Sequence, residues 1–160
     1  MSSAHLIAEG HRRIGFIRPH PDHALAQARF AGYLAALADA GLPRDEALIA
    51  PGYFDMDSGA AAAERLLDLA DRPSAIFAAN DDMALGAMRV AHERGLSIPG
   101  DIAIAGFDDS PASRMVWPPL TTVRQPTRLM GETAVAMLLD ETAAPPLHHE
   151  LLIRASTRGA

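Results

Sequence analysis

The segment from residue 75 to residue 109 constrains the fold more than any other part of the chain. Two apolar runs, Ala75–Ala79 and Ile102–Phe107, flank a segment with helical periodicity at Asp81–Arg94. Strand, helix and strand at this spacing form a parallel βαβ unit. Each apolar run ends in polar residues, and in open parallel sheets ligands bind beyond the carboxyl ends of the strands. The segment therefore predicts a parallel sheet with a ligand-binding edge.

The same alternation extends over the first two thirds of the chain. Strands are predicted at Arg13–Ile17, Leu48–Ala50, Ala75–Ala79 and Ile102–Phe107, and helices at Ala24–Ala40, from a cap at Asp57 or Ser58 to about Ala70, and at Asp81–Arg94. This order indicates a parallel sheet with right-handed crossovers. Because the strands are almost continuously apolar, helices should cover both faces. The predicted fold class is α/β, a doubly wound parallel sheet.

The pattern changes after Asp109. An irregular segment, Ser110–Pro119, precedes a strand at Leu120–Val123, a helix at Pro126–Asp140 and a last strand at Glu150–Arg154. At the other end, Ala4–Glu9 has the pattern of the last turns of a helix. Because a domain seldom begins with the end of a helix, we expect the chain to be a fragment of a longer protein.

Composition excludes several functional classes. The net charge is −6, all fourteen basic residues are arginine, and there is neither lysine nor cysteine. A P-loop lysine, a lysine Schiff base and a cysteine zinc site are therefore excluded, and extended contact with nucleic acid is disfavoured. The sequence has no secretory signal and no apolar stretch near the roughly 20 residues that span a bilayer. A cytoplasmic protein without a membrane segment is predicted.

Polar residues directly follow each predicted strand. They are Arg18, Phe54-Asp55, Asn80-Asp81 and Asp108-Asp109, and Arg29 lies two turns into the following helix. Carboxylates that accept hydrogen bonds, an amide and an aromatic ring suit a sugar, a nucleoside or a similar polyol. Each residue also has a structural alternative: Asp81 and Asp82 can complement a helix dipole, and Phe54 can serve packing.

Catalytic and metal-binding functions receive little support. The motifs G-x-S-x-G, G-x-G-x-x-G and H-E-x-x-H do not occur. Hydrolysis by the carboxylates of Asp81 and Asp108 remains an alternative. The pairs His20-x-x-His23 and His148-His149 fit solvated loops better than a metal site. We expect no enzyme, no metal and no cofactor.

The predicted helix Asp81–Arg94 carries more apolar surface than covering a sheet requires. Leu85 and Met88 extend it, and Val116 and Trp117 lie in the irregular segment. These four residues form a possible dimer interface, and a homodimer is expected. The alternative is an unusually well-buried helix.

Several blocks in register resemble the lactose/galactose-repressor (LacI) family. They are GHRRIGFI, RFAGYLAAL, the pattern from Phe54 to Gly59, AIFAANDDMALGAMRVAHERGLSIPGDIAIAGFDD, PPLTTVRQP and MGETAVAMLLD. The resemblance covers nearly all of Gly10–Thr157. It implies a bacterial transcription regulator whose effector domain has the two-lobed, type I periplasmic-binding-protein-like fold, here with a Rossmann-like lobe. It also implies that a sugar-like or nucleobase-like effector binds between the lobes and changes the affinity for operator DNA.

The resemblance also implies five effector-binding residues. Arg29 and Asp108 hold hydroxyls, and Asn80 adds a polar contact. Phe54 stacks on the ring of the effector. Gln125 is implied by the resemblance alone and reaches the site from the region where the chain crosses between the lobes.

By the same resemblance, residues 10–118 are the C-terminal lobe of the effector-binding domain. Residues 1–9 and 119–142 are pieces of the N-terminal lobe, and 148–157 is a last strand that returns to the C-terminal lobe. The family's helix-turn-helix and hinge helix do not appear in the sequence, so operator contact is expected through a missing N-terminal domain. The expected function is effector sensing and dimerisation in a LacI-type regulator. The alternative is a periplasmic sugar-binding protein of a transport system.

Overall fold

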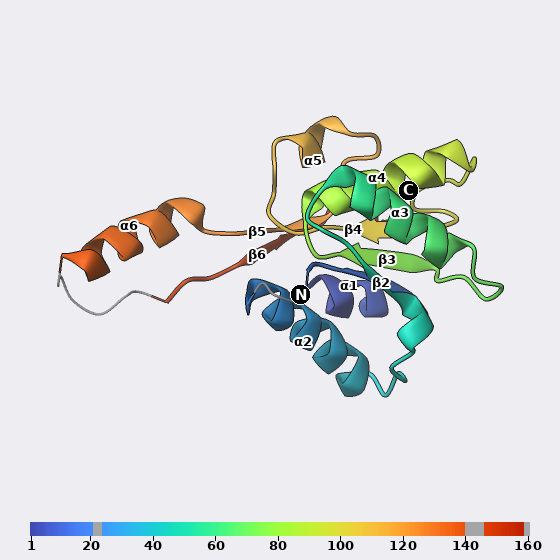
Figure 1. The fold of residues 1–160 in the computed structure, drawn as a ribbon, viewed down its shortest axis with the longest axis horizontal. Coiled ribbons are helices and arrows are strands. Elements are labelled where there is room, and N and C mark those ends of the chain that lie inside the picture. Colours follow the sequence, from blue (N-terminus) through green and yellow to red (C-terminus); the bar gives the residue numbers. More distant parts are fainter. Residues whose placement is uncertain (21–23, 140–145, 159–160) are drawn as a thin grey trace.

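The computed structural model describes residues 1–20, 24–139 and 146–158, and its centre is a four-stranded parallel sheet (Figure 1). The strands lie in the order β2-β1-β3-β4, with bounds β1 Ile14–Arg18, β2 Ile49–Pro51, β3 Ala75–Ala78 and β4 Ala103–Ala105. Phe16 of β1 pairs with Ile49 on one side and with Phe77 on the other. The predicted α/β fold with a parallel sheet is confirmed. Strands β3 and β4 are shorter than their apolar runs, whereas β1 and β2 keep the predicted lengths and are shifted by one residue.

Helices cover both faces of this sheet (Figure 1). The short helix α1 (Ser2–Ala8) and α2 (Ala24–Asp39) lie on one face, and α3 (Met56–Leu67) and α4 (Asp81–Glu93) lie on the other. Helices α3 and α4 pack so closely that a side chain on Gly86 would overlap the backbone of Met56. On the opposite face Phe16 stacks on Phe30 and Tyr33 at 5.6 and 4.8 Å between ring centroids. These contacts form a core of side chains removed from water.

The helix ends follow from local capping. Asp55 accepts a hydrogen bond from the Ser58 amide at 2.7 Å and begins α3, so the cap predicted at Asp57 or Ser58 is wrong by two or three residues. Asn80 begins α4 by accepting from the Met83 amide at 3.0 Å. Gly95, with φ of 71°, follows the end of α4. A 3₁₀ turn (Glu46–Leu48), capped by Asp45, precedes β2.

Beyond β4 the chain builds a second, smaller unit. A short helix α5 (Ala112–Met115) interrupts the segment predicted to be irregular, and β5 (Thr122–Arg124) pairs antiparallel with β6 (Glu150–Leu152). Helix α6 (Thr127–Leu138) stands at the end of this ribbon, away from the sheet (Figure 1). The predicted helix extended to Asp140, which lies outside the described residues together with 141 and 142.

Parts of the two segments expected in a second lobe, residues 1–9 and 119–142, pack on the four-stranded sheet. Leu6 of α1 is fully buried in the core, and His5 Nε2 lies 2.8 Å from the Thr157 hydroxyl. Leu120 is likewise fully buried in the core. Helix α1 contacts α2 and β3, and its His5 contacts the segment after β6. The return of the C-terminal segment is visible in the bond from the Ile104 amide to the Ser156 carbonyl at 3.0 Å.

Within the described residues, no helix has the combination of length and apolar character that crossing a bilayer requires.

Candidate functional site

Three of the five predicted effector-binding residues meet at the carboxyl edge of the sheet. Asp108 follows β4, Arg29 lies on α2, and Gln125 directly follows β5. Arg29 Nη2 lies 3.4 Å from Asp108 Oδ1, and Gln125 Nε2 donates to the same oxygen at 2.5 Å. Three elements that are distant in sequence thus contribute one positive, one negative and one amide side chain to a single polar group.

Arg29 is held rigidly within this group. Its Nη1 donates to the Ala79 carbonyl at 2.6 Å, and its guanidinium carbon lies 4.0 Å from the centre of the Phe107 ring. Burial lowers the pKa of Arg29, while Asp108 and Asp81 raise it in opposition. Because a guanidinium stays charged in proteins, Arg29 presents a fixed, planar set of donors with 11% of its side chain exposed.

Asp108 retains hydrogen-bonding capacity. Both bonds that it receives from described side chains use Oδ1, and 35% of its side chain is exposed. Burial raises the pKa of Asp108, an effect opposed by Arg29 and by the bond from Gln125. Its backbone has φ of 123°, and its amide donates to the Val123 carbonyl at 2.9 Å, so the loop after β4 is fastened to β5. The second carboxylate oxygen can accept a hydroxyl of a ligand.

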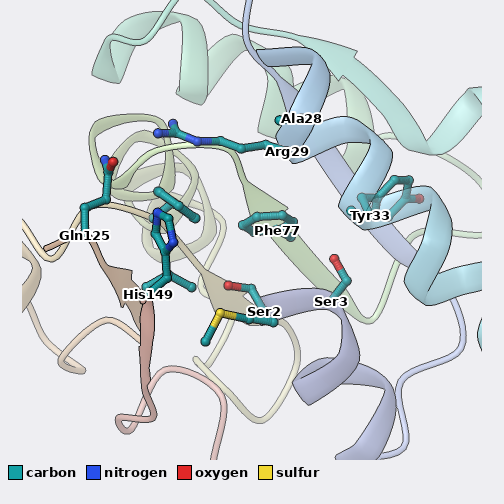
Figure 2. A pocket seen from close by; sticks show the side chains of 12 residues that line it. Ser2, Ser3, Ala28, Arg29, Tyr33, Phe77, Gln125 and His149 are labelled. Carbon is teal, nitrogen blue, oxygen red and sulfur yellow. The ribbon is translucent and has the colours of Figure 1, made fainter. Parts of the chain in front are cut away.

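A cavity of about 300 Å³ adjoins the polar group (Figure 2). Figure 2 shows Arg29 and Gln125 at one end, Tyr33 and Ser3 at the other, and Phe77 between them. Its walls are mainly apolar and aromatic, with a few polar side chains at the rim, as in many small-molecule sites. Sequence reasoning missed Tyr33, Phe77 and Phe107 in this lining, because core aromatic residues and cavity-lining ones have the same pattern, and it assigned His149 to a solvated loop.

Phe54 and Asn80 form a separate pair. Asn80 Nδ2 donates to the Phe54 carbonyl at 3.0 Å, and its Oδ1 caps α4, so both ends of the amide are in use and the residue is buried. Phe54 has φ of 67°, a left-handed conformation. Neither residue lines the cavity beside Arg29. The structure therefore joins these two residues to each other, and neither belongs to the lining of the cavity.

Asp81 is a buried acid, not a member of an open carboxylate pair. It is 1% exposed, and it accepts hydrogen bonds from the Thr122 hydroxyl at 2.6 Å and from the Ser110 amide at 2.7 Å. Burial raises the pKa of Asp81, and these bonds act in the opposite direction. The hydrolytic alternative required Asp81 and Asp108 to face a substrate together. Asp81 instead ties α4 to β5.

The four residues predicted for a dimer interface surround a hollow of about 390 Å³. Leu85 and Met88 are buried within the chain, whereas Trp117 is 82% exposed. Val116 is half-buried against the core. The exposed apolar surface therefore comes from the segment around α5 more than from α4.

Metal ligands do not gather in the described part of the chain, where no group of three or more His, Asp or Glu side chains could hold an ion. His20 lies beside Tyr53 with 5.6 Å between ring centroids, and His23 lies outside the described residues. His149 faces the ring of Phe107 at 5.7 Å.

Comparison with known proteins places this chain in a family. The model of the periplasmic binding protein-like domain matches residues 3–159. The repressor PurR of Vibrio atlanticus (strain LGP32) is 35% identical over 99% of this chain and 49% of its own length. The structure of the transcriptional regulator CelR with cellobiose is 41% identical, with a TM-score of 0.87 over 96% of this chain and 49% of that one.

A LacI-family regulatory protein from Chloroflexus aggregans has a TM-score of 0.89 at 40% identity, over 97% of this chain and 58% of that one. The chain spans about half the length of the curated relatives it matches. The chain therefore belongs to the family of periplasmic binding protein-like domains, in the form that LacI-family transcriptional regulators carry.

Proposed function

We propose that this chain is the effector-sensing and dimerising part of a bacterial LacI-type transcription regulator. The observation that carries the proposal is the convergence of Arg29, Asp108 and Gln125 beside an apolar cavity at the carboxyl edge of the sheet. Such an edge is where open parallel sheets bind ligands. A guanidinium, a carboxylate and an amide together offer donors and acceptors to adjacent hydroxyls.

A sugar-like effector fits this chemistry best. Asp108 accepts hydrogen bonds from hydroxyls, Arg29 donates to them, and Gln125 does either. The related regulator CelR has been solved with cellobiose, which supports a carbohydrate. A nucleobase-like effector is the second candidate, because the aromatic cavity wall suits a flat ring.

Phe54 and Asn80 act as one unit in this proposal. The ring of Phe54 stacks on the effector, and Asn80 keeps the backbone of Phe54 in place through the bond to its carbonyl. This role for Asn80 differs from a direct polar contact, because both ends of its amide already have protein partners. The five residues still belong to one site at the same edge of the sheet.

The two-lobed arrangement is part of the proposal. Residues 10–118 and 148–157 form one lobe together with α1, and α6 belongs to a second lobe. The apolar side chains of Val135, Met137 and Leu138 on α6 are 57%, 62% and 84% exposed, which supports contact with further protein. The effector lies between the lobes.

Dimerisation and DNA binding complete the proposed regulator. A second copy covers Trp117 and the hollow lined by Leu85, Met88 and Val116. Operator DNA binds through a helix-turn-helix unit outside these residues, since a net charge of −6 disfavours DNA contact here. The similar proteins named above are regulators, which favours this function over a transport protein or an enzyme.

A ligand screen tests the proposal. Thermal unfolding of the purified protein is measured with cellobiose, other sugars, nucleosides and nucleobases, because a ligand that binds only the native state raises the unfolding temperature. Calorimetry then compares the wild type with Asp108→Asn and with Asp39→Asn, an exposed acid at the end of α2. We expect Asp108→Asn to weaken binding about 10- to 100-fold, since a hydrogen bond to a charged group contributes about 1.5–3 kcal/mol. Equal affinities in all three proteins contradict the assignment of the site.

A further inference from the structure

Asp109, the residue next to the effector-site acid, is the centre of an arginine cluster. Its side chain is 3% exposed and lies within hydrogen-bonding distance of three guanidinium groups. Arg114 Nη2 and Arg124 Nε donate to Oδ2 at 2.7 and 2.8 Å, and Arg154 Nη2 donates to Oδ1 at 2.5 Å. Because these arginines come from α5, β5 and the segment after β6, one carboxylate joins three parts of the chain.

Two consecutive acids therefore pair with two consecutive residues, the last residue of β5 and the one that follows it. Asp108 receives a bond from Gln125, and Asp109 receives one from Arg124. The backbone supports the same register, since Asp108 forms a parallel bridge with Arg124. The loop after β4 and the end of β5 are thus joined at two adjacent positions, one inside the effector site and one outside it.

The loop that carries both acids needs such a fastening. Asp109, with φ of 55°, lies in the left-handed region that aspartate tolerates, whereas Asp108, with φ of 123°, lies outside it, where a side chain other than glycine is strained by about 1–3 kcal/mol. Charge-assisted hydrogen bonds are roughly twice as strong as neutral ones. The arginine cluster therefore holds the loop in a conformation that it would otherwise leave.

We propose that Asp109 is a positioning residue, which fixes β5 through Arg124 so that the Gln125 amide meets Asp108 Oδ1. The placement of the Gln125 amide by Asp109 follows from these contacts alone, whereas the effect of Asp109 on ligand affinity rests on the proposed function. Asp109 itself does not touch the effector.

The three arginines differ in what they can transmit. Arg124 bonds Asp109 and also Glu150 of β6 at 3.0 Å, so it holds the ribbon that carries Gln125. Arg154 bonds the Ser113 hydroxyl and the Leu120 carbonyl, both at 2.9 Å, and thus fastens α5. Arg114 lies on α5 and is 59% exposed. Arg114→Ala is therefore a matched control, because it removes a partner of the same carboxylate without altering β5.

Nuclear magnetic resonance tests the geometric part without any ligand. The sequence contains two glutamines, Gln27 and Gln125, so protein labelled with ¹⁵N-glutamine gives two side-chain amide pairs, assigned with Gln125→Ala. We expect Asp109→Asn and Arg124→Ala to move the Gln125 signals toward those of a free glutamine side chain. Arg114→Ala should leave them in place, and the Gln27 signals report that α2 is intact. Arg124→Ala decides the matter if Asp109→Asn does not fold.

Unchanged Gln125 signals in Arg124→Ala, or an equal displacement in Arg114→Ala, would overturn the proposal. The functional part is tested by calorimetry with cellobiose. Arg124→Ala alone should weaken binding about tenfold. Added to Gln125→Ala, it should have little further effect, since the free-energy effects of two residues that act through one contact do not add. Additive losses contradict action through Gln125. If the wild type does not bind cellobiose, that choice of effector fails, and the resonance experiment still decides the geometry.

Discussion

Asp108 and Asp109 are adjacent in the chain, yet they lie in two contrasting regions of the molecule. The region around Asp108 is open, with 35% of the carboxylate side chain exposed, one arginine and one amide as partners, and an aromatic cavity alongside. The region around Asp109 is closed, with 3% exposure and three arginines. The same residue type thus keeps an unused acceptor where its hydrogen bonds are incomplete and joins parts of the chain where they are complete.

The pKa directions express the same contrast. Burial raises the pKa of Asp108, and Arg29 and Gln125 only partly oppose it. Burial also acts to raise the pKa of Asp109, but hydrogen bonds from Arg114, Arg154 and Arg124 hold it well below the ordinary value. The number of cations decides which effect wins, because each opposite charge within a few ångströms favours the ionised acid.

The largest expected effect is the loss of the charge on Asp109. Asp109→Asn leaves three arginines without their carboxylate and should lower the free energy of unfolding by about 3 kcal/mol, which corresponds to about 6–12 °C in Tm. The native pKa lies below that of the unfolded chain, so this stabilisation is present above about pH 4 and is lost as the pH falls through the native value. Urea unfolding of both proteins at pH 7 and pH 3 measures it. A difference that is small at pH 7, or equally large at pH 3, contradicts this account.

The open acid should respond to pH in the opposite way. Because the native pKa of Asp108 is raised, its carboxyl group takes up a proton at a higher pH than an ordinary aspartate does. The protonated group is a weaker acceptor, so effector affinity should fall as the pH is lowered. The fall approaches about tenfold per pH unit below that pKa, since one proton is linked to binding. Over the same range the protonation of Asp108 favours the folded state, so affinity and this contribution to stability move in opposite directions. Calorimetry from pH 7 to pH 4 tests this, and Asp108→Asn should lack the dependence.

The sequence predicts the sheet well because its signals are local. Apolar runs, helical periodicity and helix-ending glycines lie within a few residues of the structure that they specify. The placement of α1 instead involves contacts between distant residues, such as that of His5 with Thr157, 152 residues away. The arginine cluster also depends on contacts that no local pattern indicates, since the partners of Asp109 lie 5, 15 and 45 residues further along the chain.

The site was predictable only where geometry follows from topology. Arg29 and Asp108 meet because parallel strands end at one edge of the sheet, and Gln125 needed the family resemblance. Asn80 shows the limit, because an amide after a strand is equally suited to a ligand and to the cap of the next helix. Local sequence does not distinguish these roles, and the bonds to Met83 and Phe54 do.

A smaller effect separates the two roles of Asn80. Asn80→Ala removes the cap of α4 and should lower the free energy of unfolding by about 1 kcal/mol. Asn80→Ser keeps an acceptor for the Met83 amide but removes the amide that donates to the Phe54 carbonyl, so it should retain most of the stability and still weaken effector binding through Phe54. Urea unfolding and calorimetry on the two variants provide the comparison. If Asn80→Ser lowers stability as much as Asn80→Ala, the cap is not the source of the effect.

The smallest expected effect concerns Phe54 itself, whose φ of 67° is strained for any residue other than glycine. Phe54→Ala and Phe54→Gly both remove the ring, so they should weaken effector binding equally. They should differ in stability, because glycine accepts the left-handed conformation without strain but loses more backbone entropy on folding. The net difference should favour Phe54→Gly by about 0.5 kcal/mol, measured by urea unfolding. An alanine variant at least as stable as the glycine variant would mean that the loop relaxes when the ring is lost, and hence that the ring itself imposes the conformation.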